Sequence, residues 1–426
     1  LICRVFNSTG RTDPPGHQEI EIGLCKLYRV TGDEKYLDQA KFFLDQRGRL
    51  GRRGPDGHGG LYGTYGQDHI PVVEQTEAVG HSVRAAYQYT GMADVAALTG
   101  NMDYVNAIDT IWNDVVSKKL YITGGIGAAG GHEGFGGPYE LPNMTAYCET
   151  CASIANILWN HRMFLMRGDT KYMDVLERTM YNAALSGISL EGDRFFYPNV
   201  LQSIGQHQRS PWFGCACCPS NVARFIPSVP GFAYAAKAED VYVNLFLGSD
   251  VMLDTPGTKL RLIQETRYPW DGKVKIRVEP EQTAQFAVNV RIPGWARNQP
   301  VPSDLYAFLH EIPEKATLRI NGQPVPLAPH EHSVVRVGYG QQVVFTADCG
   351  GEIPEAGRVA LAIYSPVLSS GPVAKILDSR WRFSSAPSLQ KRGNLSFRRT
   401  TSGCNWASAA TISRPGLRRP TNDRGG

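Results

Sequence analysis

The sequence predicts an α + β protein of several domains, with helical hairpins in the first half and an antiparallel β-sandwich in the second. Three observations predict this class. A helical pattern recurs three times before residue 180, the apolar residues change from helical to alternating spacing near Val241, and the alternating segments are short and separated by Pro and Gly. With 426 residues, the chain is long enough for two or three domains.

The recurring helical pattern indicates hairpins. Thr31–Asp38, Thr99–Asn106 and Arg167–Asp174 resemble one another, and their glycines are spaced 68 residues apart. Each glycine can end one helix in the left-handed conformation, and the Asp or Asn after it can cap the next helix. Stacked hairpins bury their faces against one another, so both a closed toroid and a solenoid fit. Three hairpins make only part of a ring, and we therefore expect an N-terminally truncated chain.

The second half has the alternating pattern of strands. Asn321-Gly322, between two short apolar runs, indicates a two-residue hairpin turn. Pro227 and Pro230-Gly231 mark the boundary between the two halves. The expected strands are 241–247, 273–278, 285–292 and 342–347. The expected domains are a helical domain at 1–232, a β-sandwich at 233–370, and a basic tail at 371–426 that is disordered or aberrant.

Charge and hydropathy exclude two classes of partner. Residues 379–426 carry ten Lys or Arg and one acidic residue, whereas the rest of the chain has 34 basic and 39 acidic residues. A basic body that would bind nucleic acid is therefore absent. No run of about 18 apolar residues is present, so we expect no membrane-spanning helix.

A glycine-rich segment resembles a dinucleotide-binding motif. Gly125-Ile-Gly-Ala-Ala-Gly130 fits G-x-G-x-x-G and follows the strand-like Leu120-Tyr-Ile-Thr. Helical hairpins surround it, and the Gly- and Pro-rich residues that follow cannot begin a helix. We therefore reject a dinucleotide site and interpret the segment as a loop that carries His132 and Glu133.

Five of the nine cysteines lie within residues 148–218, in Tyr147-Cys-Glu-Thr-Cys and Cys215-Ala-Cys-Cys-Pro. Clustered thiols indicate metal or nucleophilic chemistry, although a redox pair and buried reduced cysteines are alternatives. Zinc is the favoured ion, since it binds thiolates readily and has tetrahedral coordination by four N, O or S ligands. Spacing alone selects Cys148 with Cys151, which would share a helical face. The first helices of the repeats begin near His17, near Glu77 and His81, and near these cysteines, so parallel stacking would bring these helix starts to one rim.

Three motifs together resemble the β-L-arabinofuranosidases of glycoside hydrolase family 127. They are Tyr121-Ile-Thr-Gly-Gly-Ile-Gly, Tyr139-Glu-Leu-Pro-Asn-Met-Thr-Ala-Tyr-Cys-Glu-Thr-Cys-Ala-Ser and Trp212-Phe-Gly-Cys-Ala-Cys-Cys-Pro-Ser-Asn. The resemblance covers roughly residues 15–370. It implies an (α/α)6 toroid followed by β-sandwich domains, of which this chain would hold a partial toroid. It also implies a retaining exo-glycosidase with a zinc-bound cysteine nucleophile.

The resemblance assigns roles to individual residues. Cys217 matches the nucleophile and Glu133 the general acid/base. His81 and Tyr197 match substrate-binding residues, and His17 is a looser match. The implied zinc ligands are Glu149, Cys151, Cys217 and Cys218. This set uses Glu149 where spacing alone would use Cys148, and it requires a non-helical turn before Cys151.

These assignments lead to a functional hypothesis. We expect release of β-L-arabinofuranose or a related L-sugar from an oligosaccharide or glycoside, with Zn²⁺ as cofactor. A homodimer is compatible with this hypothesis, and the reduced thiol cluster favours a cytoplasmic location while secretion stays open. The alternative is a non-catalytic carbohydrate-binding or scaffold protein with a structural zinc–thiolate site.

Overall fold

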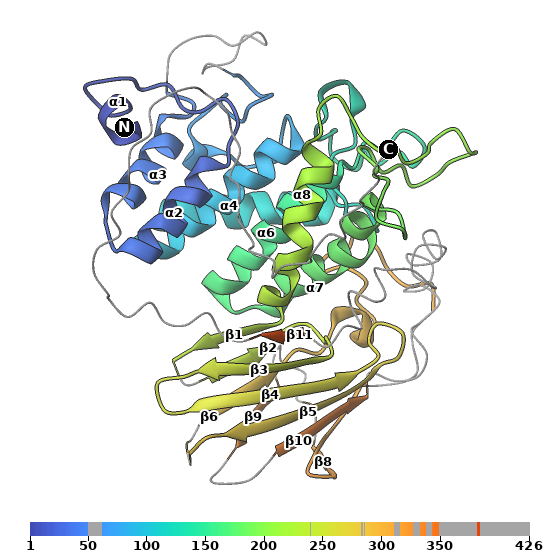
Figure 1. Ribbon diagram of the computed structural model, residues 1–426. Helices are drawn as coiled ribbons and strands as arrows, with labels where there is room; N and C mark the ends of the chain where they lie inside the picture. Colours follow the sequence, from blue (N-terminus) through green and yellow to red (C-terminus); the bar gives the residue numbers. More distant parts are fainter. Residues whose placement is uncertain are drawn as a thin grey trace, which may run out of the picture. The chain divides into compact units, whose positions relative to one another are not determined.

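The computed structural model describes residues 1–49, 62–238, 240–282, 284, 286–310, 316–325 and 327, and the backbone of strands at 333–337, 343–348 and 381–383. Leu1–Ser385 is one compact unit that contains all of these residues. Helices occupy its first part and strands its second part, as Figure 1 shows. Apart from 381–383, the expected basic tail at 371–426 lies outside the described residues.

The predicted helical hairpins are confirmed. Three pairs follow one another along the chain, namely α2 with α3, α4 with α5 and α6 with α7. The helices are α1 (Ile2–Val5), α2 (Ile20–Thr31), α3 (Lys35–Gln46), α4 (Ser82–Thr99), α5 (Met102–Asp114), α6 (Thr150–Arg167), α7 (Thr170–Arg178) and α8 (Cys217–Phe225). Within the described part of the chain, no helix is both long and apolar enough to cross a bilayer.

The turn of each hairpin has the structure that its sequence predicts. Gly32, Gly100 and Gly168 end α2, α4 and α6 in the left-handed conformation, with φ of 70°, 70° and 76°. The Asn101 side chain then accepts two backbone N–H groups at the start of α5, and Asp169 accepts one at the start of α7. The cap residue of α3, Glu34, makes no such bond, although Asp33 Oδ1 accepts the N–H of Lys35 at 3.2 Å. A left-handed glycine therefore ends the first helix of each hairpin, and a side-chain cap begins the second helix in two of the three.

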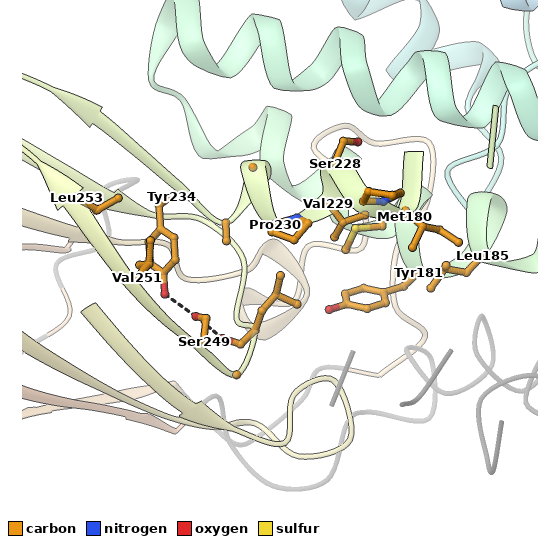
Figure 2. Close-up of a pocket in the computed structure, with 16 residues that line it drawn as sticks. Met180, Tyr181, Leu185, Ser228, Val229, Pro230, Tyr234, Ser249, Val251 and Leu253 are labelled. Carbon is orange, nitrogen blue, oxygen red and sulfur yellow. Dashed lines mark hydrogen bonds between the residues drawn. The ribbon is translucent and has the colours of Figure 1, made fainter. Parts of the chain in front are cut away.

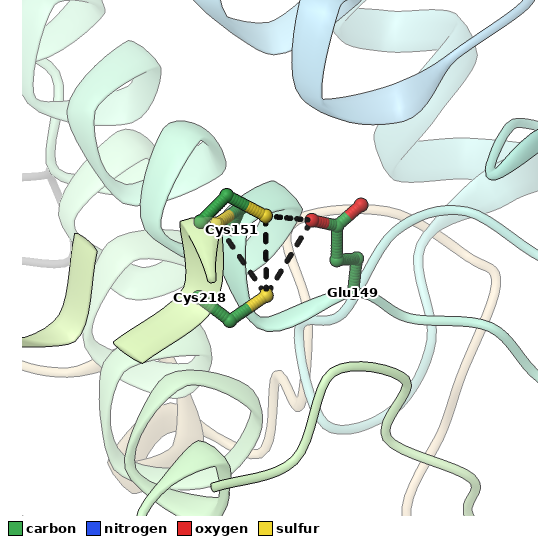
Figure 3. A group of neighbouring side chains, drawn as sticks. Glu149, Cys151 and Cys218 are labelled. Carbon is green, nitrogen blue, oxygen red and sulfur yellow. Dashed lines mark hydrogen bonds between the residues drawn. The ribbon is translucent and has the colours of Figure 1, made fainter. Parts of the chain in front are cut away.

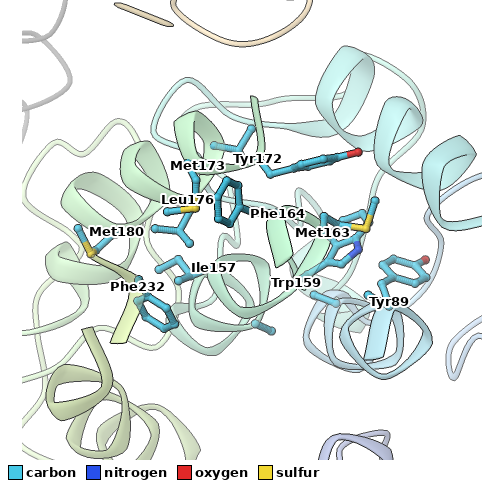
Figure 4. Packing of buried hydrophobic residues seen from close by; sticks show 14 of the residues in the cluster. Tyr89, Ile157, Trp159, Met163, Phe164, Tyr172, Met173, Leu176, Met180 and Phe232 are labelled. Carbon is cyan, nitrogen blue, oxygen red and sulfur yellow. The ribbon is translucent and has the colours of Figure 1, made fainter. Parts of the chain in front are cut away.

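The first helices of the hairpins form the core of the helical part. α4 and α6 pack against each other, and α2 and α8 contact them on either side. Trp159 of α6 is fully buried, and its ring lies 4.9 Å from that of Tyr89 in α4 (Figure 4). The second helices pack against this layer and against each other, since Trp112 of α5 donates its indole N–H to Asn160 Oδ1 of α6 at 2.8 Å and its ring lies 4.8 Å from that of Tyr172 in α7. The hairpin starts are thereby held in one register.

Two sheets follow the helices. One has the strand order β1-β2-β6-β9 and the other β11-β3-β4-β5-β10-β7-β8. The strands are β1 (Tyr234–Lys237), β2 (Asp240–Val243), β3 (Ser249–Asp254), β4 (Lys259–Thr266), β5 (Lys273–Pro280), β6 (Phe286–Val290), β7 (Thr317–Ile320), β8 (Gln323–Val325), β9 (Ser333–Val337), β10 (Val343–Asp348) and β11 (Trp381–Phe383). Alternate residues of β4 and β5 are buried, and both sheets contribute to one apolar cluster. The predicted Asn321-Gly322 turn joins β7 to β8, with both residues at positive φ.

The expectation of a purely antiparallel sandwich is wrong for two pairs of strands. β2 pairs with β6 in parallel, as does β3 with β11. Parallel neighbours need a long connection, and the three strands β3 to β5 lie between β2 and β6 in the chain. Alternating hydrophobicity reveals a strand but not the direction of its neighbour. The strand-like Leu120-Tyr-Ile-Thr is also not a strand, because it enters a turn in which Gly124 N–H bonds to the carbonyl of Tyr121.

A buried ion cluster ties the helices to the sheets. The Arg291 guanidinium, at the end of β6, is fully buried and lies 2.6 Å from both Asp174 Oδ1 and Glu177 Oε1 of α7. It also donates to the carbonyl of Asn244, which follows β2. Removing one member of such a cluster leaves a buried charge without its partner, which lowers the free energy of unfolding by about 3–5 kcal/mol.

Candidate active site and metal centre

The start of α6 carries two donor side chains. Glu149 is the residue before the helix and has extended backbone, and Cys151 lies in the first turn. Cys148 has a φ of 39°, so the backbone turns sharply before the helix begins. The non-helical turn that the Glu149–Cys151 pairing requires is therefore present, and Cys148 lies in a separate apolar cluster.

A returning loop holds this turn in place. Asn199 donates from its side chain to the carbonyl of Cys148 at 3.0 Å, and its N–H bonds to the carbonyl of Tyr147 at 2.8 Å. The N–H of Thr150 bonds to the carbonyl of Tyr197 at 3.0 Å. The loop that carries Tyr197 is thus joined to the start of α6 by backbone and amide hydrogen bonds.

The vicinal cysteines lie at the start of a second helix. Cys217 and Cys218 are the first two residues of α8, where free N–H groups and the helix dipole favour a thiolate. α8 packs against α6, so the two helix starts meet. Cys218 is fully buried, whereas Cys217 is partly open.

Four donor atoms converge where these two helices begin (Figure 3). Cys151 Sγ lies 3.5 Å from Cys218 Sγ, and Cys217 Sγ lies 3.8 Å from Cys218 Sγ. Glu149 Oε1 lies 3.4 Å from Cys217 Sγ and 3.5 Å from Cys218 Sγ. All four donors lie within 4.8 Å of one another, so this group can hold a metal ion.

The spacing of the donors fits a tetrahedral zinc site. With Zn–S bonds of about 2.3 Å and a Zn–O bond of about 2.1 Å, two sulfurs are about 3.8 Å apart and a sulfur and an oxygen about 3.6 Å apart. The separations of 3.4–3.8 Å agree with these values. The other carboxylate oxygen of Glu149 is buried without a hydrogen-bond partner. Three thiols and a carboxylate are donors that suit zinc.

The four donors also shift one another's protonation. Hydrogen bonds from the Cys151 and Cys218 thiols and the Tyr197 hydroxyl lower the pKa of Cys217. Hydrogen bonding raises the pKa of Cys151 and Cys218, and burial raises that of Glu149 to about 9. The Cys217 sulfur, which is the most open of the three, is therefore the one that is most readily a thiolate.

A second carboxylate, that of Glu133, lies next to this group. His81 Nε2 lies 2.8 Å from Glu133 Oε2, and the Tyr147 hydroxyl donates to Glu133 Oε1 at 2.7 Å. His81, Glu133 and Glu149 each place a donor atom within 4.8 Å of the others. Glu133 lies on the glycine-rich loop at a φ of 54°, and its carbonyl accepts hydrogen bonds from the N–H and hydroxyl of Ser82.

The remaining substrate-site candidates surround these residues. The Tyr197 hydroxyl oxygen lies 3.1 Å from Cys217 Sγ, within hydrogen-bond distance. The His17 ring lies 6.3 Å from the His81 ring, and burial lowers the pKa of both histidines, which keeps them neutral at neutral pH. Glu77 instead lies at the surface beside Lys119. Parallel stacking thus brings His17, His81 and Glu149 together as expected, whereas Glu77 is not part of the group.

Tyr147 and Asn199 belong to the site, although the sequence alone gives them no role. Tyr147 was visible only as the residue before the first cysteine of C-x-x-C, a position without a recognised role. Asn199 lies some fifty residues from the turn that it holds. Neither contact can be read from spacing, because both depend on the fold of the loops.

An apolar cavity lies elsewhere in the described part of the chain. It has a volume of about 480 Å³ and an apolar lining that includes Met180, Leu185, Val229, Tyr234 and Val251 (Figure 2). None of the donors described above lines it. The converging polar groups, and not this apolar cavity, therefore identify the candidate site.

Two family models and a curated protein match this chain. The GH127 catalytic domain of β-L-arabinofuranosidases matches residues 7–231, and the GH127 middle domain matches residues 240–339. A non-reducing end β-L-arabinofuranosidase of Bifidobacterium longum is 33% identical over 337 residues, which are 72% of this chain and 48% of that protein.

Solved structures give the same result. A GH127 β-arabinofuranosidase is 51% identical with a TM-score of 0.76, over 82% of this chain and 54% of the other. A GH127 β-L-arabinofuranosidase from Geobacillus stearothermophilus T6 is 38% identical with a TM-score of 0.73, over 82% of this chain and 56% of the other. The chain spans about half the length of these relatives. It belongs to the β-L-arabinofuranosidase family, glycoside hydrolase family 127.

Proposed function

We propose that this chain carries the active site of a retaining exo-glycoside hydrolase that releases β-L-arabinofuranose or a related L-sugar. The observation that carries the proposal is the convergence of a thiol and a carboxylate on Glu149. Glu149 Oε1 lies 3.4 Å from Cys217 Sγ, and Glu133 places a carboxylate oxygen within 4.8 Å of a Glu149 carboxylate oxygen. Nucleophile and acid/base are thus close enough to act on one glycosidic bond.

In the first step, the Cys217 thiolate attacks the anomeric carbon and the bond to the leaving oxygen breaks. Glu133, in its acid form, gives its proton to that oxygen as it departs. The product of this step is a glycosyl group joined to the Cys217 sulfur. His81 and Tyr147 hold the two oxygens of Glu133 throughout.

In the second step, Glu133 takes a proton from water and the water oxygen attacks the same carbon. The carbon–sulfur bond breaks and Cys217 leaves as a thiolate. Each step inverts the configuration, so the sugar is released with its original configuration. A thiolate is a good leaving group, and the lowered pKa of Cys217 supports this role.

A metal ion supports the chemistry of the thiol. We propose Zn²⁺, held by Glu149, Cys151, Cys217 and Cys218, because the donor set and its spacing fit that ion. When bound, zinc keeps a thiol deprotonated near neutral pH, where a free cysteine with a pKa of about 8.5 is mostly protonated. His81, Tyr197 and His17 are proposed to bind the sugar.

The proposal includes the architecture. The succession of α2, α4, α6 and α8, each in contact with the next, supports part of an (α/α)6 toroid. The proposed domains are 1–232 and 233–370, followed by the tail at 371–426. A homodimer stays a prediction that sedimentation of the purified chain tests.

The test is hydrolysis of 4-nitrophenyl β-L-arabinofuranoside by the wild-type chain and by Cys217→Ser, with zinc measured in both. We expect release of arabinose and nitrophenol by wild type alone. If both proteins bind zinc and neither releases arabinose, the rival function of a non-catalytic carbohydrate-binding or scaffold protein replaces the proposal.

A further inference from the structure

We infer that Tyr147 is a positioning residue that orients the Glu133 carboxyl group for proton transfer. This inference rests on the proposed acid/base role of Glu133. It starts from the short hydrogen bond of 2.7 Å from the Tyr147 hydroxyl to Glu133 Oε1. No motif or comparison assigns Tyr147 a role.

Glu133 needs external support for its orientation. Its side chain is 35% exposed and projects from a glycine-rich loop. A glutamate side chain loses rotational entropy when it is held in one conformation, and a partly exposed site provides little packing to hold it. The main-chain contacts to Ser82 fix the backbone of Glu133 but not its carboxyl group.

Two partners hold the carboxyl group instead. Tyr147 takes Oε1 and His81 takes Oε2, so rotation of the carboxyl group would break both hydrogen bonds. With His81 alone, the group could still turn about a single contact. A proton passes efficiently only across an aligned hydrogen bond, so the second contact directs the acid toward the leaving oxygen.

Tyr147 is itself held rigidly. Its carbonyl accepts the N–H of Asn199, and it is two residues before Glu149. Its ring lies 6.3 Å from the ring of Tyr197 and beside Gly130, which begins the turn that carries Glu133.

The test is the Tyr147→Phe variant, assayed on two β-L-arabinofuranosides. The 4-nitrophenyl glycoside has a leaving group that needs no proton, whereas the methyl glycoside has one that does. We expect kcat/KM to fall about 10- to 100-fold for the methyl glycoside and less than about threefold for the nitrophenyl glycoside. Zinc content should stay at the wild-type level.

The matched control is Tyr121→Phe, which removes a hydroxyl that donates to the carbonyl of Pro142 at 3.1 Å and does not contact Glu133. It should leave the ratio of the two substrates unchanged. Equal losses on both substrates in Tyr147→Phe, a loss of zinc, or no change would overturn the inference.

Glu133→Ala, assayed in parallel, separates this inference from the proposed function. If Glu133→Ala discriminates between the substrates and Tyr147→Phe does not, only the role of Tyr147 is wrong. If Glu133→Ala lowers both substrates equally, or the wild type is inert on both, the acid/base assignment fails and the inference fails with it.

Discussion

Substitution of the two cysteines of C-x-x-C tests which residues bind the metal. Cys148 and Cys151 are both buried and three residues apart, but only Cys151 belongs to the donor group. We expect Cys151→Ala to weaken zinc binding strongly and Cys148→Ala to leave it almost unchanged. The pair is well matched, because both variants remove one buried thiol from the same motif.

The magnitude follows from the number of donors. A structural zinc site contributes about 10–16 kcal/mol of binding free energy, which four ligands share as roughly 2.5–4 kcal/mol each. Loss of the Cys151 sulfur, which lies 3.5 Å from Cys218 Sγ, should therefore weaken affinity about 10²- to 10³-fold. Loss of the Cys148 sulfur should change affinity less than about threefold, since Cys148 is not one of the four converging donors and packs in a separate apolar cluster.

The assay is competition for zinc against a chromogenic chelator at neutral pH, with thermal unfolding of the zinc-loaded variants as the control for folding. Comparable losses of affinity in both variants would refute the geometry, as would a larger loss in Cys148→Ala. In either case C-x-x-C would act as a pair, which the helical spacing favours and the turn at Cys148 opposes.

Three further predictions concern catalysis, stability and pH. Glu133→Ala should lower turnover of substrates with poor leaving groups about 10²- to 10⁴-fold, and added azide should yield a β-glycosyl azide, detected by mass spectrometry and NMR; loss of that product's retained configuration would contradict the two-step mechanism. Arg291→Met should lower the free energy of unfolding by about 3–5 kcal/mol in urea titrations, because Asp174 and Glu177 lose their buried partner; a change below about 1 kcal/mol would exclude a stabilising role. Burial lowers the pKa of His161 to about 3, below its ordinary 6.5, so only the unfolded chain takes up this proton between those values and stability is lost as pH falls from 6.5 toward 3. At pH 5 this proton uptake lowers the free energy of unfolding of the wild type by about 2 kcal/mol relative to pH 7.5. His161→Leu should not show this loss between the two pH values, and an unchanged pH dependence would disprove the assignment.

The repeat shows what the sequence alone determines well. Hairpin turns depend on neighbouring residues, so Gly100 at the end of one helix and Asn101 at the start of the next could be assigned from their types and spacing. The same holds for the Asn321-Gly322 turn between β7 and β8. The repeat also predicted that the helix starts near His17, near Glu77 and His81, and near Glu149 and its neighbouring cysteines would meet at one rim, because units stacked in parallel place their helix starts side by side. His17, His81 and Glu149 do meet, whereas Glu77 lies outside the group.

The proposed metal ligands could not be predicted from local sequence patterns. Spacing favours Cys148 with Cys151 on one helical face, and only resemblance to a family pointed to Glu149. The structure has a left-handed residue at Cys148, and Asn199, from a distant loop, bonds to its carbonyl. That contact depends on chain segments some fifty residues apart, which no local pattern contains.

Tertiary structure alone decided two further features. The parallel pairing of β2 with β6 depends on where the intervening strands lie, and alternating hydrophobicity is the same for either direction. The hydrogen bond between Tyr147 and Glu133 depends on how a glycine-rich loop folds against the start of α6. Local sequence determines helices, turns and the kinds of donors, whereas the angles at which loops meet depend on packing across the whole chain.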